Sequence, residues 1–305
     1  MSVPHFPDLM VDVGGHRLHA HVSGEGSPAV VFDAALGTTL LSWALVQPKV
    51  ARATRTVSYD RAGLGFSEPG PMPRTVSRCR AELEALLNAL GIQGGPLVLV
   101  GHSFGALVAR HYAAAHRDRV VGMVLVDPAL PDDWVNPTPQ RRKRMELGAR
   151  FARRGAVAAK LGIARVVSAL ITLGAAGMAR TNVRMMTGHR ATTELERMLA
   201  PVSRLPAELR PHLKKFWTQP KFYRALASQI DHLPAGAAEV QAAGGFGAMP
   251  LIVVSAEGNA EPQMAAEAVS LSSAGAHVVV KNTGHWIQLD QPGVVVQTIM
   301  RVLGR

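Results

Sequence analysis

The sequence predicts an α/β fold in which helices cover both faces of a mostly parallel sheet. Its 305 residues allow one large domain or two small ones, with a substantial core. Short runs rich in Val, Ile and Leu, bounded by Gly, Pro, Asp or Ser, are typical of strands buried on both faces. Helical patterns alternate with these runs, which indicates the α/β class. The predicted strands are 29–32, 56–59, 97–100, 120–126, 251–254 and 277–280.

Three further elements are predicted before residue 120: a hairpin strand and two helices. The strand follows Gly14-Gly15. Along it, His16, Leu18 and Ala20 alternate with Arg17, His19 and His21, as expected when successive side chains point to opposite faces. A helix is predicted over 80–90, because four leucines share one face: Leu83, Leu86, Leu87 and Leu90. A second helix, 104–116, begins directly after the strand 97–100.

Between residues 131 and 247 the strand rhythm breaks and only helical patterns follow. The predicted helices are 141–160, 163–179, 192–199, 207–216 and 222–230. In the first of them one face carries Leu147, Phe151, Ala158 and Leu161, with arginines around them. We therefore predict a core of residues 1–131 and 248–305. An all-helical cap, 132–247, is inserted between the sixth and seventh strands of this core.

The charge of the chain is concentrated in this predicted cap. The formal net charge is +11, yet residues 141–224 alone hold 19 Lys and Arg against 4 Asp and Glu. Three interpretations stay open: a solvated helical surface, attraction to an anionic lipid surface or acidic substrate, and nucleic-acid binding. No zinc-finger spacing or RNP-like aromatic motif accompanies the charge, so we expect no nucleic-acid partner.

Composition also limits the compartment and the kinds of site. Cys79 is the single cysteine, which excludes an intramolecular disulfide and a cysteine-rich zinc site. The first ten residues lack the pattern of a signal peptide. The most lipid-like run, 166–179, is shorter than the 18 or so residues of a membrane span. We expect a soluble, cytoplasmic protein whose basic cap touches an anionic membrane surface at most peripherally.

Residues 101–105 read Gly-His-Ser-Phe-Gly, and their context matters more than the pattern. A predicted buried strand precedes them and a predicted helix follows. A strand-to-helix turn this tight requires glycines, because a Cβ would clash. It would project Ser103 at the N-terminus of a helix, where amides and the helix dipole favour a developing anion. We predict that Ser103 is a nucleophile; the alternative is a purely structural turn.

A serine nucleophile requires a base, and His285 is the candidate among twelve histidines. It follows Gly284 in a predicted loop after the strand 277–280, where the alternative is a surface histidine. His102 would point away from the Ser103 hydroxyl and is expected to be structural. His19 and His21 could share a strand face, but no carboxylate accompanies them in the pattern. We therefore predict no metal site.

With these motifs the sequence resembles the α/β-hydrolase superfamily over residues 11–131 and 250–303. The resemblance includes the elbow at Ser103, the turn 59–67 (Tyr-Asp-Arg-Ala-Gly-Leu-Gly-Phe-Ser) and Gly284-His285-Trp286, where the family has its catalytic histidine. The resemblance implies the fold and not the substrate, since esterases, lipases, peptidases, perhydrolases and receptors share it. The family's dehalogenases and epoxide hydrolases use a nucleophilic Asp, and Ser103 argues against both.

The chain departs from the family's pattern at two places. Asp33-Ala34 stands where the family usually has His-Gly, so Ala35 and Phe104 would supply the oxyanion-hole amides while Asp33 braces the loop. The loop where many relatives carry the acid has Asn259 near the expected place. Asp127, after the strand 120–126, is the favoured acid. Glu257 is the alternative, and Glu261 lies further out.

The residues together predict a serine hydrolase of carboxylic esters that acts through an acyl-enzyme. The resemblance implies no metal and no organic cofactor. Leu36 and Trp286 are the expected substrate contacts. An apolar acyl pocket, or simple packing of cap on core, would account for the apolar residues Ile163, Val166, Val167, Leu170, Ile171 and Leu173. Amide or peptide hydrolysis and acyl transfer would use the same residues; a non-catalytic binder or receptor is the alternative outside enzymes.

Overall fold

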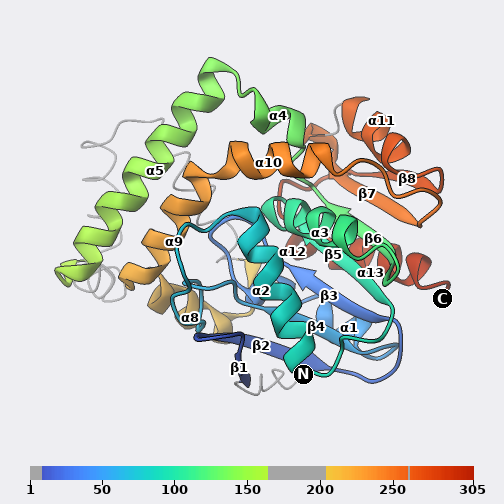
Figure 1. Cartoon of the computed structure of the whole chain (residues 1–305), viewed down its shortest axis with the longest axis horizontal. Helices are drawn as coiled ribbons and strands as arrows, with labels where there is room; N and C mark the ends of the chain where they lie inside the picture. Colours follow the sequence, from blue (N-terminus) through green and yellow to red (C-terminus); the bar gives the residue numbers. More distant parts are fainter. Residues whose placement is uncertain (1–8, 164–203, 260–261) are drawn as a thin grey trace.

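A single eight-stranded sheet forms the centre of the molecule, as the computed structural model describes it for residues 9–163, 204–259 and 262–305. Its strand order is β1-β2-β4-β3-β5-β6-β7-β8 (Figure 1). β1 and β2 pair antiparallel, β2 is antiparallel to β4, and β3 to β8 are parallel. The strands are β1 (Leu9–Asp12), β2 (Arg17–Ser23), β3 (Ala29–Asp33), β4 (Thr56–Tyr59), β5 (Leu97–His102), β6 (Val120–Val126), β7 (Leu251–Ala256) and β8 (Gly275–Val280). The predicted mostly parallel sheet is confirmed.

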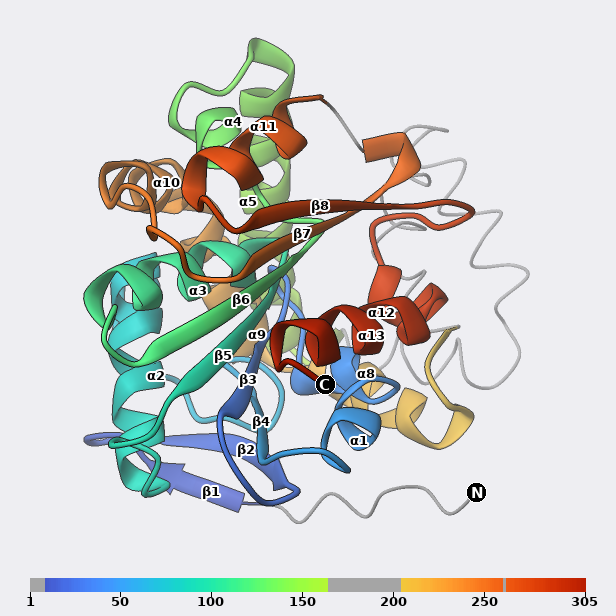
Figure 2. The same ribbon diagram turned by 90° about the vertical axis from the view of Figure 1, so that its right-hand side faces the viewer.

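Helices cover both faces of this sheet (Figure 2). α2, α3, α10 and α11 lie on one face, and η1, α1, α12 and α13 lie on the other. The core helices are η1 (Leu40–Trp43), α1 (Gln47–Val50), α2 (Val76–Ala89), α3 (Phe104–Ala115), α11 (Pro262–Leu271), α12 (Ile287–Asp290) and α13 (Pro292–Val302), with η3 (Glu257–Asn259) after β7. This three-layer arrangement buries the strands on both sides, as their continuous apolar runs predict.

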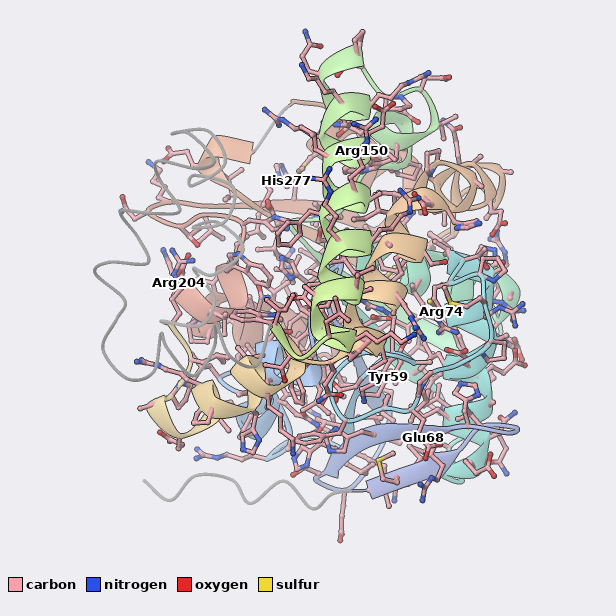
Figure 3. All side chains as sticks on the ribbon, turned by 90° about the vertical axis from the view of Figure 1, so that its left-hand side faces the viewer. Tyr59, Glu68, Arg74, Arg150, Arg204 and His277 are labelled. Atoms are coloured by element: carbon pink, nitrogen blue, oxygen red, sulfur yellow. The ribbon has the colours of Figure 1, made fainter. Side chains whose placement is uncertain are left out.

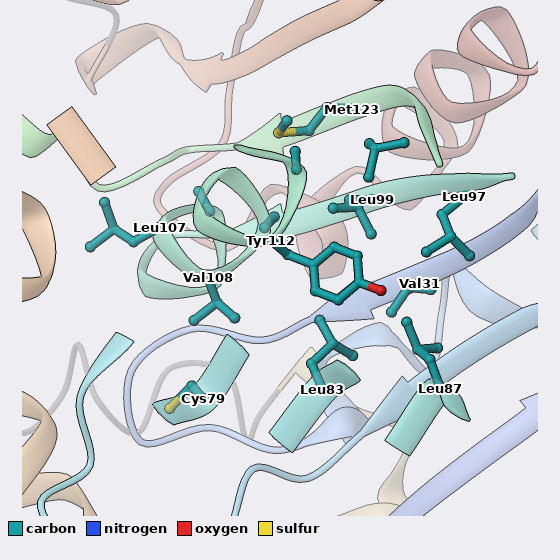
Figure 4. Close-up of a cluster of buried hydrophobic side chains, with 14 of the residues drawn as sticks. Val31, Cys79, Leu83, Leu87, Leu97, Leu99, Leu107, Val108, Tyr112 and Met123 are labelled. Carbon is teal, nitrogen blue, oxygen red and sulfur yellow. The ribbon is translucent and has the colours of Figure 1, made fainter. Parts of the chain in front are cut away.

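Alternate residues of each central strand enter different cores. Val31 and Leu99 pair across β3 and β5 and pack against Leu83 and Tyr112 on one face (Figure 4). Their strand neighbours point to the opposite face, where α1 and α13 cover them. Because side chains alternate with a period of two, one run of valines and leucines contributes to both cores.

The N-terminal hairpin is confirmed, but its polar face is not exposed. Val11 pairs with Leu18 across β1 and β2, and Leu18 is fully buried. His19 and His21, on the other face of β2, are buried as well. The Nδ1 atom of His19 lies 2.9 Å from Oδ2 of Asp60, so the turn after β4 covers this face. The alternation in the sequence therefore predicts the strand correctly, but it does not reveal that the turn after β4 covers the second face of this strand.

Helices fill the described chain between β6 and β7. They are α4 (Pro131–Val135), α5 (Pro139–Lys160), η2 (Ala207–Leu209), α8 (Arg210–Phe216), α9 (Pro220–Asp231) and α10 (Leu233–Ala242). The predicted helices 163–179 and 192–199 fall mostly or wholly outside the described residues, so the division into core and cap at 132 and 247 stays a prediction. α5 packs along α9 through Ala149 and Ala152. A Cβ on Gly155 would lie 2.5 Å from the Tyr223 ring, which shows how closely the two helices approach.

Several element boundaries differ from those predicted. β5 continues to His102 and β7 to Ala256, so both strands reach further toward the sheet's carboxyl edge. α2 begins four residues earlier than predicted, because the Thr75 hydroxyl accepts a hydrogen bond from the amide of Arg78 and caps the helix. No helix in the described part of the chain is both long and apolar enough to span a bilayer.

Candidate active site

Ser103 occupies a strained turn between β5 and α3. Its φ of 52° and ψ of −115° are unfavourable for a residue with a Cβ. The turn is held on both sides, since the Ser103 amide donates to the carbonyl of Val126 at 3.1 Å and its carbonyl accepts from the amide of Ala129 at 3.2 Å. The predicted elbow geometry is present, with the serine directly before the first turn of a helix.

The two glycines of the elbow allow close backbone approach. A Cβ on Gly101 would lie 2.6 Å from the carbonyl oxygen of Gly105, inside the turn itself. A Cβ on Gly105 would lie 2.4 Å from the carbonyl oxygen of Asp33 and 2.7 Å from that of Ala34. The N-terminus of α3 therefore rests directly on the loop after β3. This contact brings the two predicted oxyanion-hole segments together.

His285 and Asp127 form a hydrogen-bonded pair at the carboxyl edge of the sheet. The Nδ1–H of His285 donates to Oδ2 of Asp127 at 2.5 Å, and the Asp127 side chain is almost fully buried. The other carboxylate oxygen, Oδ1, accepts from the amide of Ala256 at 3.2 Å. Asp127 itself has a positive φ of 39° directly after the end of β6, a conformation that few residues with a Cβ adopt. Glu257 lies exposed in η3, so the favoured acid, rather than its alternative, meets the histidine.

His102 holds the backbone of the histidine loop. Its ring is fully buried, and its Nε2 lies 2.8 Å from the carbonyl oxygen of His285. Gln288 donates from Nε2 to Nδ1 of His102 at 2.9 Å, so Nδ1 is an acceptor and Nε2 carries the proton. Burial lowers the pKa of His102 well below its usual value, with the nearby His285 adding to the effect. A neutral His102 therefore donates to the His285 carbonyl, in keeping with its predicted structural role.

Arg61 braces the loop that carries Ala35. Its guanidinium forms an ion pair with Asp33, and it also donates to the carbonyl of Ala34 at 2.6 Å and to that of Ala35 at 2.5 Å. The same group lies 5.0 Å from the ring centroid of Phe104. Neither the Ala35 amide nor the Phe104 amide donates to another described residue. The predicted bracing role of Asp33 is thus carried out together with Arg61.

A buried polar network surrounds this ion pair. The Tyr59 hydroxyl donates to Oδ2 of Asp33 at 2.6 Å. Burial raises the pKa of Asp33 despite the adjacent Arg61 guanidinium, and burial also raises the pKa of Tyr59 well above its usual value. Both side-chain groups that donate to the Asp33 carboxylate belong to the turn 59–67, so this turn supports the loop after β3.

A cavity of about 100 Å³ lies between α8 and α9, on one side, and the loop after β3 with the start of α12, on the other. Both predicted substrate contacts, Leu36 and Trp286, line it, and each directly follows a candidate catalytic residue in sequence. From the cap side the cavity is lined by Leu205, Leu213, Trp217, Phe222 and Leu226. Ile163, three residues after the end of α5, is half exposed and does not line this cavity, and the predicted pocket residues 166–173 lie outside the described residues. The cap residues that do line it were not predicted.

Three further residues escaped the sequence-based prediction. Arg204, Gln288 and Asp290 contact the histidine loop or its supports, but no motif marks them. Only Gln288 and Asp290 could have been suspected from the sequence, because they lie within five residues of His285. In the described part of the chain, no three His, Cys, Asp or Glu side chains are grouped in a way that could hold a metal ion.

The comparison with protein families agrees with this geometry. The family model described as "Alpha/beta hydrolase family" matches residues 23–298, nearly the whole chain. The chain belongs to the alpha/beta hydrolase family. Among solved structures, the epoxide hydrolase CorEH without ligand superimposes on this alpha/beta hydrolase with a TM-score of 0.71. That alignment covers 98% of this chain and 99% of the other, at 17% identity, and therefore supports the fold alone.

Curated relatives of this alpha/beta hydrolase carry different activities in their names. Epoxide hydrolase A of Mycobacterium tuberculosis (strain ATCC 25618 / H37Rv) is 27% identical, with 97% of each chain covered. Lipase LipV of the same organism is 47% identical over 74 residues, covering 24% of this chain and 27% of the lipase. The chain spans less than half the length of the first curated relatives that it matches. The relatives thus agree on the family and not on the reaction.

Proposed function

We propose that this alpha/beta hydrolase cleaves carboxylic esters by nucleophilic catalysis from Ser103. The observation that carries the proposal is the 2.5 Å contact between His285 and Asp127, beside the elbow that holds Ser103. A serine hydroxyl is a weak nucleophile at neutral pH and becomes reactive when a base accepts its proton. An oriented histidine at a strained serine elbow supports this chemistry.

The reaction follows from the atoms at the site. Ser103 Oγ attacks the acyl carbonyl while Nε2 of His285 accepts its proton, and Asp127 stabilises the resulting imidazolium through Nδ1. The amides of Ala35 and Phe104 donate to the oxyanion of the tetrahedral intermediate. His285 then protonates the leaving alcohol, and water attacks the acyl-enzyme by the same steps in reverse.

Ring opening of epoxides and displacement of halides are less compatible with this nucleophile. A carboxylate that attacks an epoxide or a haloalkane forms an ester, which water can hydrolyse to release the product. A serine oxygen that attacked the same carbon would form an ether, which neither His285 nor water could cleave. Ser103 therefore favours acyl substrates, although a haloalkane dehalogenase and an epoxide hydrolase are among the relatives.

The cavity supports an apolar acyl group on the substrate. Eight of its twelve lining residues are Leu, Trp or Phe, and only Thr38, Thr39 and Ser42 carry hydroxyls. Leu36 and Trp286 connect it to the candidate oxyanion loop and the histidine loop. A volume of about 100 Å³ suits a short acyl chain of a few carbons.

The decisive experiment combines labelling with turnover. A fluorophosphonate probe should label the wild-type protein and not Ser103→Ala, and p-nitrophenyl esters should be hydrolysed only by the former. Loss of a triad member lowers kcat by roughly 10⁴–10⁶. A series of esters and amides of increasing acyl length then separates esterase from amidase. Labelling of folded Ser103→Ala, or no turnover of any acyl substrate, would refute the proposal and favour a binder.

A second pair of variants tests the acid. Asp127→Asn should lower kcat by about 10⁴, because an amide cannot stabilise the imidazolium and can select the wrong tautomer. Glu257→Gln is the matched control, since Glu257 is exposed and should leave kcat near the wild-type value. The reverse pattern in two folded proteins would assign the acid to Glu257 and leave Ser103 and His285 in place.

A further inference from the structure

The helix α5 turns its small residues inward and its large apolar residues outward. Ala149, Ala152 and Ala159 are its buried residues. Leu147 is 55% exposed and Phe151 50% exposed. The apolar face read from the sequence is therefore not the face that packs on the core. A protein that leaves large apolar side chains in water on one helix face commonly uses that face for binding.

Cations share this outward face. Lys143, Arg150 and Arg154 are spaced by seven and four residues, which places them on the same side of the helix as Leu147 and Phe151. All three are exposed, and none forms an ion pair with any described residue. By contrast, Arg141 and Arg153 on the same helix are paired with Asp133 and Asp231, at 2.6 Å each. Figure 3 shows α5 along the front of the molecule, with Arg150 on its upper half.

We propose that this outward face of α5, defined by Lys143, Leu147, Arg150, Phe151 and Arg154, docks on an anionic lipid surface. A helix with cations and large apolar side chains on one exposed face lies in the interface of a bilayer. There the apolar groups enter the acyl boundary and the cations meet anionic headgroups. Nucleic acid would use the cations but would gain little from Leu147 and a half-exposed Phe151.

The docking face lies one helix away from the cavity. α5 packs on α9, and α9 supplies Phe222 and Leu226 to the cavity wall. Docking through α5 would hold the cap side of the site at the lipid surface. Docking itself requires no hydrolysis, so its test stands apart from the proposed function.

The test measures binding of the full chain to vesicles of phosphatidylcholine alone and with about a third phosphatidylserine, by flotation at several salt concentrations. The wild type should prefer the anionic vesicles, and the preference should weaken with salt because the Debye length falls. The variant Lys143→Ala/Arg150→Ala/Arg154→Ala should bind on the order of 100-fold more weakly, at about one kcal/mol for each cation. Leu147→Ser/Phe151→Ser should bind at least about tenfold more weakly.

A matched control removes the same charge elsewhere. Lys49, Arg52 and Arg301 are exposed on or beside α1 and α13, away from α5 (Figure 1). Lys49→Ala/Arg52→Ala/Arg301→Ala should change binding less than about threefold, because these groups are not on the docked face and salt screens attraction at longer range. Thermal unfolding shows whether each variant is folded.

Four outcomes would overturn the proposal. The first is equal binding to both vesicle types, and the second is binding that salt leaves unchanged. The third is an equal loss of vesicle binding in the control triple variant and the α5 triple variant, which would mean that binding depends on the net charge of the protein and not on the α5 face. The fourth is tighter binding of the α5 face to duplex DNA or RNA than to the anionic vesicles, which would identify the partner as nucleic acid.

Discussion

Arg204 and Asp290 form an ion pair of 2.6 Å that joins the segment before η2 to the histidine loop. The pair uses Oδ1 of Asp290. The other oxygen, Oδ2, accepts from the Thr283 hydroxyl at 3.0 Å and from the Gly284 amide at 3.3 Å. One carboxylate therefore fixes the two residues before His285 while holding a residue from the cap side of the chain. The position of His285 is thus linked to that of the predicted cap through a single side chain.

This arrangement predicts that Asp290→Ala lowers kcat far more than Arg204→Ala does. The first variant releases the histidine loop, and a shift of about 1 Å in a reacting group can cost on the order of 100-fold in rate. The second removes only an ion pair at a partly exposed site, worth at most about 1 kcal/mol. Steady-state kcat and KM on a soluble ester measure both effects. Equal losses, or a change confined to KM, would contradict a positioning role for Asp290.

The sequence anticipates features that depend on local pattern. Buried strands, the elbow at Ser103 and the histidine after Gly284 each depend on residues adjacent in the chain, so periodicity and turn chemistry reveal them. The sequence favours Asp127 over Glu257 because a strand end fixes where a side chain emerges. Such inferences need no knowledge of the tertiary packing.

Long-range contacts leave no such local signal. Arg204 meets Asp290 across 86 positions, and His102 meets Gln288 across 186. Only the folded chain brings these partners together. The sequence also does not reveal that Leu147 points outward from α5. The face that packs on α9 carries the small residues Ala149 and Ala152, which allow the two helices to approach closely.

The brace under the oxyanion loop predicts that Arg61→Lys impairs turnover more than folding. A lysine keeps the positive charge beside Asp33, but its single ammonium cannot reproduce the planar fork that reaches two carbonyls. We expect kcat to fall by roughly 10–100-fold. Arg61→Met should also lower the free energy of unfolding by about 3–5 kcal/mol, because it leaves a buried carboxylate without its partner. Wild-type kcat in Arg61→Lys would show that the brace does not position the loop.

The contact of α3 with the loop after β3 predicts that Gly105→Ala is destabilising. Its Cβ would lie 2.4 Å from a backbone oxygen, so the loop or the helix must shift, at a cost of about 1–3 kcal/mol. The same shift would misplace the Phe104 amide and lower kcat. Gly94→Ala is the matched control, because nothing lies within 4 Å of its Cβ, and it should leave the unfolding free energy equal or slightly higher. Denaturant titration of both variants gives the comparison.

The hydrogen bond from Gln288 predicts the tautomer of His102. With Gln288 donating to Nδ1, the proton lies on Nε2 and bonds the His285 carbonyl. In Gln288→Glu a carboxylate can only accept, so the proton should move to Nδ1 and the bond to His285 should be lost. Nitrogen-15 NMR of the imidazole reports this exchange directly, and kcat should fall with it. An unchanged spectrum in the folded variant would show that the amide of Gln288 does not set the tautomer.

Burial of His21 predicts that the protein loses stability as the pH falls below about 6.5. Burial, with a smaller effect of His19, lowers the pKa of His21 to about 4 in the folded protein, whereas an unfolded histidine titrates near 6.5. Between these values the unfolded state binds the extra proton, so the free energy of unfolding rises with pH and falls on acidification. The slope from one fully titrating histidine is about 1.4 kcal/mol per pH unit. Urea titrations from pH 7 to pH 4.5 should therefore show a shallower slope in His21→Gln than in the wild type, whatever the variant's absolute stability. Parallel slopes would mean that His21 is protonated in the native state, and that its burial does not control the acid sensitivity of the fold.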